Sequence, residues 1–135
     1  MNIEEKFESI KNILLRKFEC EAIVLFGSYA RNTQNEESDI DIAIKSNKKI
    51  SKKEIFETRL ELEETIKNDI DLINLDNIND DFKYEILMNG KTLYCKDQLK
   101  FELYKLDMCQ EYFDLNESRQ SIIERIKNGG KIYGK

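Results

Sequence analysis

The sequence predicts an α/β (α+β) fold, a small mixed β-sheet with flanking helices, and two observations point to this class. Segments with helical apolar spacing alternate along the chain with short apolar or alternating runs typical of strands. The 135 residues suffice for one core that buries about 65–70% of the unfolded surface, but not for two cores of ordinary size. We expect a single domain over residues 1–135, with a core of about 1–95 and a helical C-terminal extension of about 97–127.

The first part of the chain contains a helix and a strand. A helix over about 3–18 is predicted because apolar residues recur at helical spacing, namely at Ile3, Phe7, Ile10, Leu14 and Phe18. The next apolar run, Ala22–Phe26, is continuous and ends at Gly27, which is typical of a central strand. A helical turn is expected to begin around Ser28.

The middle of the chain predicts a strand, a helix and a second strand. Residues 39–44 alternate between apolar and small or acidic side chains, which indicates the first of these strands. Ser51 is a candidate N-cap, since Glu54 follows at capping-box spacing, and the helix is expected to continue to about Lys67. Residues 69–75 alternate again and predict another strand.

The last part predicts a short helix, an edge strand and a helical tail. Residues 80–88 form the short helix, which is expected to end at Asn89-Gly90, and residues 91–95 form the edge strand. From Asp97 to about Lys127 the pattern is helical, with a break expected near Asn116.

Composition excludes several classes of chemistry. The chain has no histidine, which rules out Ser-His-Asp and Cys-His catalysis and removes the commonest zinc ligand. Cys20, Cys95 and Cys109 are far apart in sequence, so we expect unreactive thiols rather than disulfides or a zinc site. The net charge of −5 argues against stable, nonspecific binding to nucleic acid.

The same composition predicts a cytoplasmic protein that does not bind membranes. Charged residues are 36% of the chain, and no apolar run approaches the roughly 20 residues that span a bilayer. The N-terminus lacks the basic head and apolar run of a secretion signal.

Two aspartates at the start of the second predicted strand are the first candidate site residues. Asp39 and Asp41 lie on one face of that strand, since successive side chains point to opposite faces. Their mutual repulsion favours a cation between them, and Mg²⁺ prefers such carboxylate oxygens. The third strand repeats the pattern with Asp69 and Asp71, and three carboxylates on neighbouring strands suit two metal ions and phosphoryl or nucleotidyl transfer.

Gly27 and Ser28 are candidate phosphate-binding residues. A strand that ends at glycine and leads into a helical turn directs backbone N–H groups and a hydroxyl toward one point, where an anion is favoured. Taken separately, a Gly-Ser pair is commonly only a turn, and an Asp-x-Asp pair is commonly a solvated strand face. Their combination, with ten residues between Ser28 and Asp39, favours a functional site.

This pattern resembles the signature of the DNA polymerase β-type nucleotidyltransferases. The stretch "FGSYARN…SDIDIAI…IDLINL", within residues 22–75, is similar to the minimal nucleotidyltransferases (MNT proteins) of that superfamily. The resemblance implies that Gly27 and Ser28 hold the triphosphate of ATP and that Asp39 and Asp41 bind two Mg²⁺ (or Mn²⁺) ions. Asp71, favoured over Asp69, would complete metal coordination near the acceptor hydroxyl and favour its deprotonation.

Asn32, Arg31 and the basic cluster Lys45–Lys53 lie near the motif, and the roles of Arg31 and of the cluster are open. Asn32 stands where the family commonly has glycine, and asparagine tolerates the same left-handed backbone. Arg31 either contacts phosphate or pairs with a surface carboxylate. The cluster Lys45–Lys53 either steers ATP or an acidic partner toward the site, or is simply a solvated loop.

The tail carries a second resemblance. Residues 104–126 are similar to the C-terminal helices of MntA-type antitoxins, MNT proteins that silence HEPN ribonuclease toxins by transferring AMP to a toxin tyrosine. This implies an Mg²⁺-dependent protein adenylyltransferase with a HEPN toxin as partner. A small-molecule nucleotidyltransferase, for example one acting on aminoglycosides, and an antitoxin that acts by binding alone are the alternatives. For the tail itself, ordinary helices that close the core are the alternative.

The tail helix has two apolar stripes, whereas a helix that only caps a small domain needs one. The first stripe contains Leu99, Leu103, Leu106 and Phe113. The second contains Phe101, Tyr104, Met108 and Tyr112. We predict that the second stripe forms a homo-oligomer or toxin contact, because aromatic and Met side chains are enriched at interfaces.

Overall fold

The computed structural model describes residues 1–31, 39–109, 124 and 127–128. The chain divides into two compact units, Met1–Lys96 and Asp97–Lys135, which are described separately. The expected single domain with a helical extension therefore stays a prediction. In the described residues, no helix is long and apolar enough to cross a membrane.

In residues 1–31 and 39–96, the first unit contains four strands and four α-helices, in the order expected from the sequence. The elements are α1 (Ile3–Lys17), β1 (Cys20–Phe26), α2 (Ser28–Arg31), β2 (Ile40–Ser46), α3 (Lys52–Ile66), β3 (Ile70–Asn74), the 3₁₀ turn η1 (Leu75–Asn77), α4 (Asp80–Asn89) and β4 (Lys91–Cys95).

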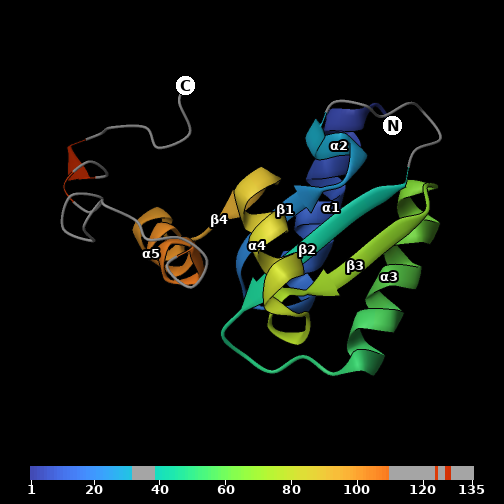
Figure 1. Cartoon of the computed structure of the whole chain (residues 1–135). Coiled ribbons are helices and arrows are strands. Elements are labelled where there is room, and N and C mark those ends of the chain that lie inside the picture. The colour runs from blue at the N-terminus through green and yellow to red at the C-terminus, as the bar shows by residue number, and fades with distance from the viewer. Residues whose placement is uncertain (32–38, 110–123, 125–126, 129–135) are drawn as a thin grey trace. The chain divides into compact units, whose positions relative to one another are not determined.

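The strands form one mixed sheet in the order β3-β2-β1-β4 (Figure 1). Strand β1 is antiparallel to β2 and to β4, while β2 and β3 are parallel and are connected through α3. The expected mixed sheet, the central position of β1 and the edge position of β4 are confirmed.

Local side-chain bonds determine where several elements begin and end. Ser51 and Glu54 form the predicted capping box, since each side chain accepts a hydrogen bond from the other residue's backbone N–H. Strand β3 ends one residue earlier than predicted because Asn74 Oδ1 accepts a hydrogen bond from Asp76 N (3.0 Å) and begins a 3₁₀ turn.

Gly90 ends α4 as predicted, but its backbone is not in the left-handed region. The reason for glycine is the close approach of other groups. A Cβ atom at Gly90 would lie 2.5 Å from Val24 Cγ1 and 2.6 Å from the Ile86 carbonyl oxygen.

The main core lies on one face of the sheet. Helices α1 and α3 cover this face, and α4 lies on the opposite side (Figure 1). The largest fully buried side chains of this core are Ile10 and Leu14 of α1, Leu62 and Ile66 of α3, Ile23 of β1, and Ile40, Ile42 and Ile44 of β2. The alternation in β2 therefore places its isoleucines in the core and Asp41 on the face that α4 partly covers.

The second unit contains α5 (Gln98–Cys109). Phe101 and Met108 of the second stripe are buried within the chain, and Tyr104 is half-buried. This burial within one chain does not test whether the second stripe contacts a partner, so the interface stays a prediction. Tyr112, Phe113 and the break expected near Asn116 lie outside the described residues.

Candidate active site

Gly27 connects β1 to α2 in a conformation that favours glycine. Its φ is +69°, in the left-handed region. Helix α2 begins at the next residue, Ser28, which is half-buried. The predicted strand–glycine–helical turn arrangement is thus present, and it directs the backbone from the end of β1 into α2.

Asp41 lies immediately beside this turn. It is paired with Phe26, the last residue of β1, across the antiparallel β1–β2 ladder. A Cβ atom built on Gly27 would lie 1.9 Å from Asp41 Oδ2, so the carboxylate occupies the space that a side chain at Gly27 would need. Gly27 is therefore required both by its backbone conformation and by its neighbour.

The parallel pairing of β2 with β3 brings a second carboxylate to Asp41. Asp71 is the direct partner of Asp41 in this ladder, and the two side chains share one face of the sheet. Asp71 and Asp39 are exposed. The sequence placed these residues on neighbouring strands, and the register makes Asp71 the carboxylate next to Asp41.

Asp39 and Asp69 lie just before their strands. The backbone N–H of Ile40 donates a hydrogen bond to the carbonyl oxygen of Asp69 (2.9 Å), which holds the two strand entries together. Asp39 and Asp69 therefore stand side by side along the backbone, one residue before Ile40 and Ile70, the first pair of the ladder. The structure therefore gathers the four aspartates at the beginning of the two parallel strands.

The donor set fits a hard divalent cation in type, since carboxylate oxygens are what Mg²⁺ prefers. In the described residues, however, no group of three or more acidic or cysteine side chains is arranged to hold a metal ion. The carboxylate of Asp41 is directed toward Gly27 in this structure. Asp39 and Asp71 are exposed, and exposed side chains change rotamer in picoseconds to nanoseconds.

Among the basic residues near the motif, the structure describes the side-chain contacts of Lys45 and Lys48 but not the side chain of Arg31. Lys45 Nζ lies 3.3 Å from Asp76 Oδ1, and Lys48 Nζ lies 3.1 Å from Glu19 Oε1. Lys45 lies in β2 and not in a loop, whereas Lys48 follows the strand and is exposed. Neither ion pair tests whether the cluster steers a ligand, which stays a prediction. Arg31 ends α2, and its side chain lies outside the description.

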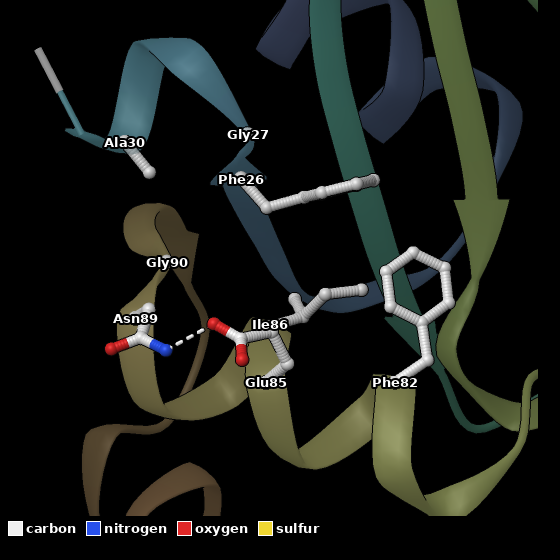
Figure 2. Close-up of a pocket in the computed structure, with 8 residues that line it drawn as sticks. All are labelled: Phe26, Gly27, Ala30, Phe82, Glu85, Ile86, Asn89 and Gly90. Carbon is white, nitrogen blue, oxygen red and sulfur yellow. Dashed lines mark hydrogen bonds between the residues drawn. The ribbon is translucent and has the colours of Figure 1, made fainter. Parts of the chain in front are cut away.

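A pocket next to Gly27 was not predicted from the sequence. It has a volume of about 120 Å³ and is lined by Phe26, Gly27, Ala30, Phe82, Glu85, Ile86, Asn89 and Gly90 (Figure 2). Phe26 and Phe82 contact each other edge to face, with ring centroids 5.7 Å apart. Helix α4 thus contributes half of the lining. In the sequence, the only sign that this helix belongs to the site is the aromatic side chain of Phe82.

Comparison with known proteins agrees with this geometry. The family described as Polymerase beta, Nucleotidyltransferase matches residues 8–99. The protein adenylyltransferase MntA of Shewanella oneidensis (strain MR-1) is 31% identical over 104 residues, which are 77% of this chain and 74% of the relative.

Solved structures are similar over most of the chain. A toxin–antitoxin crystal structure with AMP-PNP contains a chain that is 28% identical, with a TM-score of 0.73, over 90% of this chain and 98% of the other. A structure of a tri-AMPylated S. oneidensis HEPN toxin in complex with an MNT antitoxin matches with 25% identity and a TM-score of 0.70, over 92% of this chain and 98% of the other. The Gly27 turn, the paired Asp41 and Asp71, and these matches together assign the chain to the polymerase β nucleotidyltransferase family.

Proposed function

We propose that this chain is a protein adenylyltransferase antitoxin, which transfers AMP from ATP to a tyrosine hydroxyl of a HEPN ribonuclease toxin and so neutralises the toxin. The observation that carries the proposal is the position of Asp41 between the Gly27 turn and Asp71. A triphosphate held at the turn would present its α-phosphate to two adjacent carboxylates.

Each residue of the site has a distinct role in this proposal. The backbone at Gly27 and Ser28 would hold the triphosphate, because the backbone N–H groups and the dipole at the start of a helical turn favour anions. Asp71 would lie nearest the acceptor hydroxyl and favour loss of its proton. The hydroxyl oxygen then bonds to the α-phosphorus, the bond from that phosphorus to the bridging oxygen breaks, and pyrophosphate leaves.

Asp39, Asp41 and Asp71 would bind two Mg²⁺ ions, or Mn²⁺ in their place. When bound, such ions supply charge neutralisation for the attacking and leaving oxygens. The support is the oxygen-only donor set and the direct pairing of Asp41 with Asp71. Asp39, the residue before β2, would join this set as an exposed carboxylate.

The acceptor and partner are inferred from the relatives. The similar S. oneidensis protein is a protein adenylyltransferase, and the similar structures are toxin–antitoxin complexes, one with AMP-PNP and one with an AMPylated HEPN toxin. These matches favour a protein acceptor over an aminoglycoside. A cytoplasmic location and a partner contact through the C-terminal helices are part of the same proposal.

The test is direct transfer. The purified chain is incubated with Mg²⁺, ATP and a candidate HEPN partner protein, and the intact mass of that protein is measured. We expect the mass to rise by one or more AMP groups, and excess chelator to prevent the change. Neutralisation of the ribonuclease without any change in mass would instead favour an antitoxin that acts by binding alone.

A further inference from the structure

The pocket beside Gly27 has a composition that suits a flat, polar-edged ring. Two phenylalanine side chains, Phe26 and Phe82, form an apolar wall, and Phe82 is 39% exposed. A dry cavity of about 150 Å³ accommodates benzene. The pocket, at about 120 Å³, is smaller than that cavity, but it has an open side, so a ring system can enter it by one edge while the rest stays in solvent.

The side of the pocket away from Phe82 is polar. Glu85 and Asn89, one turn apart on α4, are joined by a hydrogen bond from Asn89 Nδ2 to Glu85 Oε2 (Figure 2). This bond orients the Glu85 carboxylate, which accepts several hydrogen bonds and donates none when ionised. The pocket thus combines an aromatic wall with an acceptor suited to an exocyclic amino group.

The position of the pocket relative to the aspartates determines which substrate it would take. In the sheet order β3-β2-β1-β4, Asp41 of β2 lies between Asp71 of β3 and the pocket residue Phe26 of β1. The proposed acceptor side is at Asp71, so the pocket is on the opposite side of Asp41. It shares Gly27 with the proposed triphosphate site, which links it to the nucleotide rather than to the acceptor.

We infer that this pocket binds the adenine base of the nucleotide, with the base against Phe82 and its 6-amino group donating to Glu85, positioned by Asn89. The inference rests on the proposed function for the presence of ATP. Aromatic stacking accepts any base, so Glu85 and not the phenylalanines would distinguish a base that has a 6-amino group from one that lacks it.

Isothermal titration of the full chain in Mg²⁺, without acceptor, tests this assignment with two probes. ATP is compared with purine riboside triphosphate, which has the same ring and phosphates but no 6-amino group. We expect ATP to bind about tenfold more tightly to the unmodified chain, as one base-edge hydrogen bond to a charged group is lost with the second probe.

Three variants separate the contributions. Glu85→Ala should bring the affinity ratio of the two probes close to one, whatever the removed charge does to triphosphate binding in general. Phe82→Ala should weaken both probes by about tenfold and keep their ratio. Glu57→Ala, an exposed carboxylate on α3, is the matched control and should change neither affinity, with circular dichroism to verify folding of each variant.

Equal affinity of the unmodified chain for both probes, or a tenfold ratio that persists in Glu85→Ala, would overturn the base assignment. These outcomes are distinct from failure of the proposed function. Preference for the 6-amino group without AMP transfer would refute the adenylyltransferase and keep the base pocket. If AMP is transferred but Glu85→Ala leaves the affinity ratio of the two probes unchanged, the adenylyltransferase is kept and the base pocket is refuted.

Discussion

The carboxylate of Asp41 lies against the α-carbon of Gly27, so closely that a methyl group at Gly27 would be 1.9 Å from Asp41 Oδ2. This contact joins the proposed phosphate-binding turn to the proposed metal-binding strand. Since β1 and β2 are antiparallel and Phe26 is paired with Asp41, the end of one strand and the beginning of the next meet at a single point.

Substitution of Gly27 by alanine should therefore lower both stability and activity. The left-handed backbone costs an L-residue about 1–2 kcal/mol, and the Asp41 side chain must turn away to make room. We expect the free energy of unfolding, measured in urea, to fall by at least about this amount, and AMP transfer to fall further.

A double-mutant cycle isolates the contact from the backbone effect. In an Asp41→Ala background the clash is absent, so Gly27→Ala should cost less stability than it does in the unmodified chain. An equal cost in both backgrounds would mean that Asp41 moves aside freely and that backbone strain is the whole effect.

Removal of one carboxylate from the aspartate group should separate activity from stability. Asp41→Asn keeps the shape of the side chain but removes its charge, so transfer should fall by several orders of magnitude in a metal-dependent enzyme. The free energy of unfolding without metal should stay level or rise by a few tenths of a kcal/mol, since like charges directly opposite each other, as Asp41 and Asp71 are, destabilise a sheet.

The same measurements apply to Asp39→Asn, for which we expect the same loss of transfer. Ser28→Ala should impair nucleotide use more mildly, because the backbone donors of the turn remain. If Asp41→Asn transferred AMP at a near-normal rate, Asp41 would be an ordinary solvated residue of the sheet and the proposed site would be incorrect.

A comparison of Asp69 with Asp71 identifies the third ligand. Asp71 is the direct neighbour of Asp41, while Asp69 precedes β3 and its backbone carbonyl accepts the hydrogen bond of Ile40. We expect Asp71→Asn to abolish transfer and Asp69→Asn, which keeps that backbone bond, to retain most of it. Single-turnover rates of the two variants at saturating Mg²⁺ provide the measurement, and the opposite order would assign the role to Asp69.

The capping box of α3 predicts a dependence of stability on pH. The pKa of Glu54 is lowered from its ordinary value, chiefly because its carboxylate accepts the backbone N–H of Ser51, and also through the Ser51 hydroxyl. A group with a lowered pKa in the folded state stabilises the protein above its ordinary pKa of 4.5. That stabilisation is lost as the pH falls through the lower, folded-state value.

Glu54→Gln should therefore reduce stability at neutral pH and have less effect under acid conditions, where Glu54 of the unmodified chain is protonated. Ser51→Ala removes the cap itself and should cost about 1 kcal/mol at neutral pH. Urea unfolding at both pH values measures these differences. Glu57→Gln on the same helix is the control, and an equal loss for Glu54→Gln and Glu57→Gln at neutral pH would argue against the capping role.

Features that depend on near neighbours in the chain were determined by the sequence itself. The isoleucines of β2 identify its buried face because side chains alternate along a strand. The Ser51–Glu54 spacing located the start of α3, since a capping box involves only one turn of helix. The strand–glycine–turn pattern at Gly27 is local for the same reason.

Only the tertiary structure decided which distant segments meet. The spacing of Asp41 and Asp71 does not determine their register, which arises from parallel pairing of β2 and β3 across the intervening helix α3. The contact of Phe26 with Phe82, and the pocket they share with Glu85 and Asn89, likewise require α4 to lie on the aspartate face of the sheet. Such pairings depend on how the packed elements bury apolar surface together, which residue periodicity does not contain.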